Sequence, residues 1–385
     1  MSKSYYSLGL MSGTSMDGVD ASIIQTDGKS KYKAILDKYF EYPKDIYQDL
    51  TKLRDKIKKR KDLKKFKKKI KSIEKNITLF HAKAANEIIK KTKANIDFIG
   101  FHGHTIFHSV DSYKDRITVQ LGDGKLLSKL TNKKVVYDFR QNDLKNGGCG
   151  APLVPIFHRL IAKVKKINLP VSFVNIGGIA NETQARNDMP NGLYAKDIGP
   201  GNCMLDAWIR KKTKKKYDDK GLIARRGEII NNSRNARNTD VLSSKIFELL
   251  TMFSLSGRKS FDINDFSLPD ILETHSLEDG AAMLTEVIKR LFHSSLQHSK
   301  RRIILCGGGR KNIFLIEQLK KKPDPKSLKP LNIKLIDKFG IDGDFVESQA
   351  FAYLAIRSYL KLPISFPETT GCKKPCTGGV IVKNF

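Results

Sequence analysis

Short apolar runs alternate with longer segments in which apolar residues recur every three or four positions. Continuous runs predict buried strands, and the helical spacing predicts amphipathic helices. We expect strands at residues 5–10, 21–25, 98–101, 117–120, 135–137, 171–175, 303–306 and 333–336. We expect helices at residues 47–63, 79–91, 153–163, 203–210, 241–252, 278–293 and 345–360. Strands that alternate with helices in this way are typical of the α/β class.

Glycine-rich turns accompany the expected strands in both halves of the chain. They lie at residues 9–18, 175–178 and 306–309. This recurrence fits two similar lobes that face a cleft, and a length of 385 residues suits two domains or one large domain. We assign residues 1–138 and 365–385 to a first lobe, and residues 139–364 to a second lobe.

The first of these turns contains Gly13 to Asp20 and joins two expected strands. Its Gly, Ser, Thr and Asp residues offer many backbone N–H groups and small hydroxyls, which together form a nest for phosphate oxygens. Asp17 is suited to hold Mg²⁺ through water. No Gly-Lys-Ser/Thr follows and no helix opens behind the turn, so it is not a Walker A loop. The turn predicts a nucleotide phosphate site, with an ordinary glycine-rich β-turn as the alternative.

Two later turns carry glycine pairs. Gly177-Gly178 suits a second hairpin that faces phosphates, with a glycine bulge as the alternative. Gly307-Gly308 ends a strand where a flat adenine ring can approach the backbone. Many α/β folds carry such a strand-to-helix turn, so the second pair is weak evidence when taken alone.

Three charged side chains are candidates for catalysis or for binding a substrate. Asp197 precedes a Gly-Pro-Gly turn that opens a helix with Asn202 at its N-cap. A carboxylate at a strand end beside a rigid turn suits a general base, with a turn-capping role as the alternative. Arg140 suits a bidentate clamp on a carboxylate or a phosphate. Glu347 lies one turn into the last long helix, where it can face the cleft.

The charge of the chain is extreme. It has 71 Lys and Arg residues against 40 Asp and Glu residues, a formal net charge of +31. Nucleic-acid binding is one interpretation, but lysines fill many loops and no clustered aromatic residues accompany them. We therefore favour solvated lysine-rich faces. The densest run, residues 52–75, predicts an amphipathic helix with a cationic outer face.

Other features bound the class of protein. No apolar run has the length of a membrane span, and the N-terminus lacks the apolar core of a signal peptide. The five cysteines are scattered, which fits a reducing cytoplasm. Cys372 and Cys376 lack a second pair, so we expect no structural metal there. His102 and His104 lack paired ligand spacing, so a core or cleft-lining role is expected for them.

Several motifs together resemble those of the anhydro-N-acetylmuramic acid kinase family. They are Gly9-Leu10-Met11-Ser12-Gly13-Thr14-Ser15-Met16-Asp17-Gly18-Val19-Asp20, residues 147–155, Asp197-Ile198-Gly199-Pro200-Gly201-Asn202 and residues 344–351. The first motif is highly specific, and the matches run in order from residue 9 to Gly379. The resemblance implies the acetate and sugar kinase/heat-shock/actin fold, in which two lobes with ribonuclease-H-like cores flank an active-site cleft.

The resemblance also implies a reaction. ATP, water and 1,6-anhydro-N-acetylmuramic acid give N-acetylmuramic acid 6-phosphate and ADP, in peptidoglycan recycling. Asp197 matches the catalytic base, and Arg140 and Glu347 match positions that line the sugar site. The positions that match the ATP site are Gly13, Thr14, Ser15, Met16, Asp17, Gly18, Val19, Asp20, Gly177, Gly178, Gly307 and Gly308. We expect Mg²⁺ with the nucleotide, and a cytoplasmic homodimer without a membrane or specific nucleic-acid partner.

The chain departs from the family pattern at a few places. Ile198 stands where the family usually has Thr, and His104 stands where it usually has Gln. Residues 253–261 replace a typical Pro-Lys-Ser-Thr-Gly-Arg-Glu segment, and the lysine-rich run has no reliable counterpart. These departures keep open a second kinase function, in which an enzyme of the same fold acts on a different sugar.

Overall fold

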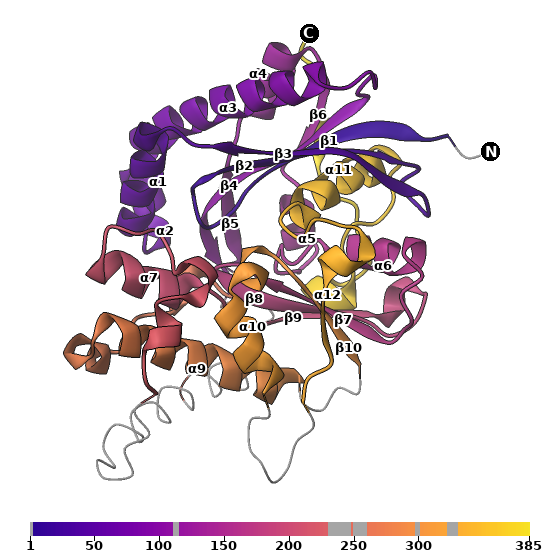
Figure 1. Cartoon of the computed structure of the whole chain (residues 1–385). Coiled ribbons are helices and arrows are strands. Elements are labelled where there is room, and N and C mark those ends of the chain that lie inside the picture. The colour runs from indigo at the N-terminus through magenta and orange to yellow at the C-terminus, as the bar shows by residue number, and fades with distance from the viewer. Residues whose placement is uncertain (1–2, 111–114, 230–247, 249–259, 297–300, 322–329) are drawn as a thin grey trace. The chain divides into compact units, whose positions relative to one another are not determined.

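The computed structural model describes residues 3–110, 115–229, 248, 260–296, 301–321 and 330–385 (Figure 1). Contacts within the chain divide it into two compact units. Unit 1 comprises Met1–Leu169, Thr183–Ala195 and Asp344–Phe385, and unit 2 comprises Pro170–Glu182 and Lys196–Gly343. The units group residues 139–169 and 344–364 with the first strands, unlike the lobes expected from the sequence.

Unit 1 is built on a sheet with the strand order β12-β6-β4-β1-β2-β3, and β5 pairs with β4. β2 lies antiparallel to β1 and β3, whereas β4 lies parallel to β1 and β6. In this register Leu8 lies between Ile23 and Ile99, and all three side chains are fully buried. The strands are β1 (Tyr5–Ser12), β2 (Gly18–Thr26), β3 (Tyr32–Glu41), β4 (Phe98–Ser109), β5 (Ile117–Leu121), β6 (Lys134–Tyr137) and β12 (Val380–Val382).

Helices cover both faces of this sheet, which explains why β1 reads as a continuous apolar run. α3 lies against one face and α11 against the other (Figure 1). The Gln349 amide on α11 donates to both carboxylate oxygens of Asp37 on β3, at 3.1 and 3.0 Å. The helices of unit 1 are α1 (Lys44–Lys56), α2 (Arg60–Lys65), α3 (Lys67–Lys90), α4 (Gly124–Thr131), α5 (Gln141–Lys145), α6 (Pro155–Val164), α11 (Val346–Tyr359) and α12 (Pro367–Thr370).

Two glycines let α11 approach the sheet unusually closely. A Cβ atom on Gly9 of β1 would overlap the carbonyl oxygen of Ser348 and the backbone nitrogen of Ala352. A Cβ atom on Gly100 of β4 would overlap the carbonyl oxygen of Phe351. Any larger residue at these positions would push the helix away from the strands.

A second sheet has the order β11-β10-β7-β8-β9 and lies mainly in unit 2, to which β8 contributes its residues up to Glu182 and β9 its residues from Lys196 onward. β10 lies parallel to both β7 and β11. The strands are β7 (Val171–Ile176), β8 (Ile179–Ala185), β9 (Leu193–Pro200), β10 (Arg302–Cys306) and β11 (Ile333–Leu335), and the helices are α7 (Cys203–Lys212), α9 (Leu277–Leu296) and α10 (Ile313–Lys320). The short 3₁₀ segments of the chain are η1 (Pro190–Gly192), η2 (Asp219–Gly221), η3 (Ala224–Arg226), η4 (Ile263–Asp265), η5 (Asp270–Thr274), η6 (Gly308–Lys311) and η7 (Ile336–Phe339).

The two sheets repeat one strand order. In each sheet the first strand in the sequence has the second and third strands on one side and later strands on the other side, which are β4, β6 and β12 beside β1 and β10 and β11 beside β7. This 3-2-1-4-5 order is that of a ribonuclease-H-like core. The expected α/β class and the expectation of two similar lobes are therefore confirmed.

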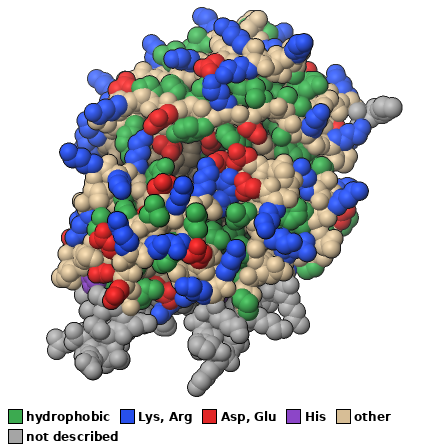
Figure 2. All heavy atoms as spheres, viewed as in Figure 1, with side chains coloured by type: hydrophobic (Ala, Val, Ile, Leu, Met, Phe, Trp, Pro, Cys, Tyr) green, Lys and Arg blue, Asp and Glu red, His purple; other side chains and the backbone are tan. Residues whose placement is uncertain are grey.

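The lysine-rich run 52–75 does not form the single helix that its spacing predicts. α1 ends at Lys56, and Ile57 has an extended backbone. The Asp62 carboxylate then accepts the N–H groups of Lys58 and Lys59, at 3.0 and 2.8 Å, and starts a new helix. Such capping stabilises a helix start at the expense of continuation, so the run is divided among α1, α2 and α3. Figure 2 shows Lys and Arg side chains scattered over this face of the molecule rather than gathered in one stripe.

The remaining expectations met mixed outcomes. Apart from residue 248, the helix expected at residues 241–252 lies outside the described residues. Strands β3, β8, β9 and β12 have no counterpart among the predicted strands, because polar residues interrupt the apolar pattern of the first three and β12 is only three residues long. Among the residues that the structure describes, no helix combines the length and the apolar character needed to cross a membrane.

The Gly9 contact can be tested by adding one methyl group. Gly9→Ala should lower the free energy of unfolding by about 3 kcal/mol, because neither backbone partner on α11 can move away alone. Gly13→Ala is the matched control, since its Cβ would meet only the Ser15 hydroxyl, at 3.9 Å. Urea unfolding followed by far-UV circular dichroism measures both variants. Equal midpoints for the two variants would show that α11 does not depend on this contact.

Candidate functional site

The turn between β1 and β2 is a tight, partly exposed loop in unit 1. The N–H of Met16 donates to the carbonyl of Gly13 at 3.1 Å, and Met16 has a left-handed backbone with φ of 58°. The Ser15 hydroxyl donates to Asp17 at 2.5 Å. Thr14 and Ser15 are exposed, so their hydroxyls and backbone N–H groups can meet a ligand.

The other predicted residues of this turn contribute differently. The side chains of Met16 and Val19 are buried in the core of unit 1, so only their backbone can face a ligand. Gly18 is needed for the fold, because a Cβ there would overlap the carbonyl oxygen of Phe40. Asp17 and Asp20 are partly exposed and keep carboxylate oxygens near this turn.

A chain of buried polar groups supports the turn from behind. The Tyr42 hydroxyl donates to Ser12 Oγ at 3.0 Å, and Ser12 Oγ lies 3.1 Å from His104 Nδ1. Burial lowers the pKa of His104 to about 3, so the imidazole is neutral at neutral pH. This chain fixes the end of β1, where the turn begins.

Arg140 lies at the N-terminus of α5 and is oriented by His102. Its Nη2 donates to His102 Nε2 at 2.9 Å, and His102 Nδ1 lies 2.9 Å from the carbonyl oxygen of Gly103. Burial and the Arg140 charge hold the pKa of His102 well below its usual range. The ring of His102 also packs on Phe351, with centroids 4.5 Å apart. Sequence reasoning assigned His102 no such role.

Glu347 lies one helical turn before Phe351 on α11. Burial raises the pKa of its carboxyl group, and the charge of Arg140 partly offsets this effect. Both residues belong to unit 1, and their assignment to the sugar site stays a prediction.

A buried cluster around Asp143 anchors the middle of α5. Asp143 accepts the N–H of Gly150 and the hydroxyl of Thr370, both at 2.7 Å. Ligand atoms of Asp143, Cys372 and Cys376 lie within 4.8 Å of one another, and all three residues are buried. These contacts connect α5 to α12 and to the C-terminal loop, and they hold the helix that follows Arg140.

Three glycine turns meet at the carboxyl ends of β7 and β10 in unit 2. The N–H groups of Gly201 and Asn202 donate to the carbonyls of Gly178 and Gly177, at 2.9 and 2.8 Å. A Cβ on Gly307 would overlap the side-chain oxygen of Asn175, which lies two residues before Gly177. Ligands of open α/β sheets bind at such strand ends.

In the turn after β10, which contains Gly307 and Gly308, the exposed residue is Gly308. A Cβ on Gly308 would meet no atom within 4 Å, whereas Gly307 has a φ of 80° that favours glycine. The backbone at Gly308 is therefore open to a flat ligand, and Gly307 shapes the turn.

Asp197 lies on β9, just before the Gly199-Pro200-Gly201 turn. Its Oδ2 accepts the backbone N–H of Phe261 at 2.7 Å, which orients the carboxylate. The neighbouring Ile198 is 1% exposed and belongs to the core of unit 2, since successive residues of a strand face opposite sides. The unusual Ile198 is thus a core residue. Asn202 is the N-cap residue of α7 as expected, but its side chain makes no capping bond.

Comparison with known proteins decides between the sugar-kinase interpretations at the level of the family. The anhydro-N-acetylmuramic acid kinase family model matches residues 5–384. A relative of that name from Pelagibacter ubique (strain HTCC1062) is 48% identical over 100% of both chains. The chain belongs to this family. Another relative of that name, from Agrobacterium fabrum (strain C58 / ATCC 33970), is 36% identical over 98% of both chains.

Membership of the anhydro-N-acetylmuramic acid kinase family confirms the resemblance drawn from the motifs. Because this is a kinase family, the chain uses ATP and a sugar substrate. Among solved structures, a gluconate kinase from Lactobacillus acidophilus is 11% identical with a TM-score of 0.36, over 93% of this chain and 90% of that chain.

The buried His104 makes stability depend on pH. Between its usual pKa of 6.5 and the folded value of about 3, the unfolded chain binds a proton that the folded chain does not. Stability from this group is therefore complete above pH 6.5 and falls as the pH falls. Between pH 7 and pH 5, the wild type should lose roughly 1–2 kcal/mol more than His104→Gln. Urea unfolding at both pH values measures this difference, and parallel pH profiles would contradict it.

Proposed function

We propose that the chain phosphorylates 1,6-anhydro-N-acetylmuramic acid with ATP while water opens the anhydro bond. The products are N-acetylmuramic acid 6-phosphate and ADP, as expected for peptidoglycan recycling. The observation that carries this proposal is the family match over residues 5–384. The oriented Asp197 carboxylate supports it, because hydrolysis requires a base.

Asp197 has the role of general base in this proposal. The oxygen of water bonds to C1 of the sugar as the bond from C1 to O6 breaks, and Asp197 accepts the proton. O6 then bonds to the γ-phosphorus as the bond to ADP breaks. The N–H of Phe261 holds one carboxylate oxygen in place, so the base does not need to be reoriented during the reaction.

The β1–β2 turn has the role of binding ATP phosphates. Exposed N–H groups and the hydroxyls of Thr14 and Ser15 suit phosphate oxygens. Asp17 and Asp20 fit Mg²⁺, which prefers carboxylate and water oxygens. The negative charge of this region also acts on the neighbouring Tyr39, because burial together with Asp17, Glu41 and Asp20 raises its pKa. When bound, Mg²⁺ would offset the negative charge of the phosphates.

Arg140 and Glu347 have the role of binding the sugar. The His102 imidazole is neutral, so its hydrogen bond orients the Arg140 guanidinium without neutralising it. A guanidinium held in this way suits the carboxylate of muramic acid or a developing negative charge. The raised pKa of Glu347 suits a carboxyl group that exchanges hydrogen bonds with sugar hydroxyls. The proposal also includes the homodimer and the cytoplasmic location that the resemblance implies.

One product measurement tests the whole proposal. The protein is incubated with ATP and 1,6-anhydro-N-acetylmuramic acid in ¹⁸O-labelled water, and the sugar product is analysed by mass spectrometry. We expect one phosphoryl group at O6 and one ¹⁸O atom at C1. A preference for an ordinary hexose, with the anhydro sugar left intact, would favour a different sugar kinase. Salt-sensitive binding to RNA or DNA without ATP turnover would favour the nucleic-acid alternative.

The isosteric variant Asp197→Asn tests the base. It should lower kcat by on the order of a hundredfold or more, because the amide cannot accept the proton. ATP binding should be unchanged, since the amide oxygen can still accept the N–H of Phe261. Asp188→Asn, at an exposed position, is the matched control. Substantial turnover by Asp197→Asn would remove Asp197 from this role.

The variant Gly13→Ala tests the phosphate turn. The free protein has room for the methyl group, so its melting temperature should not change. A phosphate that approaches the Gly13 backbone would meet that methyl group, so the KM for ATP should rise about tenfold or more. The KM for the sugar serves as the internal control. An unchanged KM for ATP would show that phosphates do not approach this backbone.

A further inference from the structure

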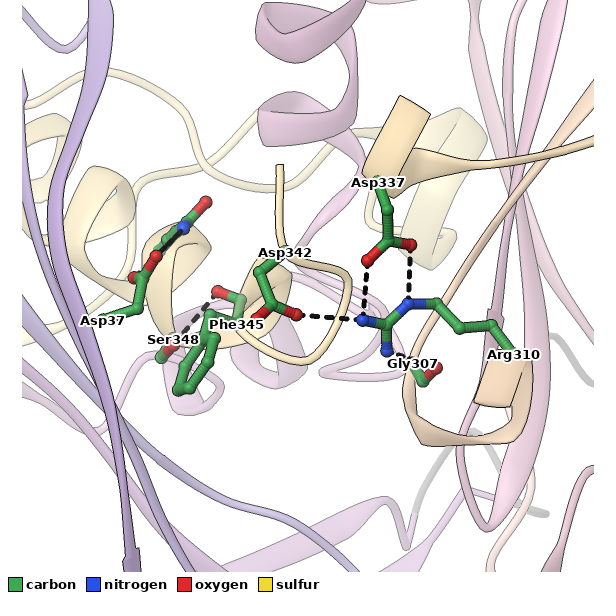
Figure 3. A network of polar contacts seen from close by, with 8 residues as sticks. Asp37, Gly307, Arg310, Asp337, Asp342, Phe345 and Ser348 are labelled. Carbon is green, nitrogen blue, oxygen red and sulfur yellow. Dashed lines mark hydrogen bonds and ion pairs between the residues drawn. The ribbon is translucent and has the colours of Figure 1, made fainter. Parts of the chain in front are cut away.

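Arg310 connects two loops that follow neighbouring parallel strands of unit 2. One loop follows β10 and contains Gly307 and η6, and the other follows β11 and runs through η7 to Gly343. Figure 3 shows the guanidinium of Arg310 between Asp337 and Asp342, with Gly307 beside it. The two loops lie at strand ends, where ligands of open α/β sheets bind.

The bonds of Arg310 are numerous and well formed. Nε and Nη2 donate to the two oxygens of Asp337, at 2.8 and 2.9 Å. Nη2 also donates to Asp342 at 2.9 Å. The Arg310 side chain is only 5% exposed, whereas the two carboxylates are 43% and 49% exposed. A buried guanidinium bound to two carboxylates is a rigid connection between its loops.

The connection extends to the backbone of the glycine turn. Arg310 Nη1 donates to the carbonyl of Gly307 at 3.2 Å, and the N–H of Gly307 donates to the carbonyl of Gly343 at 3.0 Å. Position 343 has room only for glycine, since a Cβ there would overlap the Arg310 guanidinium. The N–H and the carbonyl of Gly307 are therefore both hydrogen-bonded, and the exposed Gly308 follows directly.

We propose that Arg310 is a positioning residue for the nucleotide, which holds the Gly307-Gly308 turn in its binding conformation from behind. This inference rests on the proposed function and on the expectation that this turn receives the adenine side of ATP. Gly308 is open while Arg310 is buried, so the side chain acts through the turn and need not touch the ligand. Without Arg310, nucleotide binding must also order the turn, and affinity falls by that cost.

The experiment compares Arg310→Ala and Arg310→Lys with the wild type in the labelled-product assay, and measures ADP binding by calorimetry. We expect Arg310→Ala to raise the KM for ATP and the Kd for ADP about tenfold, with kcat and the sugar KM within about twofold. Arg310→Lys keeps the charge without the bidentate geometry, so it should recover only part of the affinity. A purely structural role would instead lower stability and affect both substrates alike.

Two further variants keep the result interpretable. Arg357→Lys alters another buried arginine, which binds the carbonyls of Pro363 and Gly28, and should leave the KM for ATP unchanged. If Arg310→Ala does not fold, Asp342→Asn removes one charged partner and should raise the KM for ATP about threefold. An unchanged KM for ATP in a folded Arg310 variant, or in Asp342→Asn, would overturn the inference while leaving the kinase function intact. A wild type that does not bind ATP would instead contradict the proposed function.

Discussion

The close packing of α11 on the first sheet is the constraint on which unit 1 depends. Gly9 and Gly100 remove the Cβ atoms that would separate the helix from β1 and β4. The same helix carries Glu347, and its Phe351 packs on His102, which orients Arg140. A helix held at the wrong distance would therefore displace the proposed sugar-binding groups together. Backbone packing and the proposed recognition of the sugar therefore share one cause in this unit.

Unit 2 uses glycine for a related purpose at the ends of its strands. Gly201 lets the Gly-Pro-Gly turn approach the Gly177 carbonyl, and Gly307 fits beside Asn175. These contacts hold the turns against one another and place Asp197 on the strand that leads into them. The repeated strand order brings glycine-rich turns to the strand ends of both units, and the side chains around them differ. The two units thus share a strand order, whereas the side chains around their glycine turns differ.

Sequence reasoning succeeded where one signal dominated. Apolar runs predicted the central strands, because these strands are buried on both faces, and the glycine motifs predicted the three turns. The sequence-based prediction of elements failed where local and tertiary effects compete. The strand β3 is half exposed and rich in polar residues, and Asp62 starts a new helix within a helical pattern that looks continuous. The roles of His102 and Arg310 depend on partners distant in sequence, so no local pattern indicates them.

The partners of two arginines help to explain how a chain with a net charge of +31 uses its positive groups. Arg310 bonds to two carboxylates, so its charge is balanced locally and its contribution is geometric. Arg140 is oriented by the hydrogen bond that it donates to the neutral imidazole of His102, and this bond adds no negative charge. Protonation of His102 would remove that acceptor and place a second positive charge beside the guanidinium, and burial opposes this by holding the imidazole neutral. The same type of side chain therefore fixes a loop in unit 2, whereas in unit 1 it is oriented by a neutral imidazole and is proposed to bind the sugar.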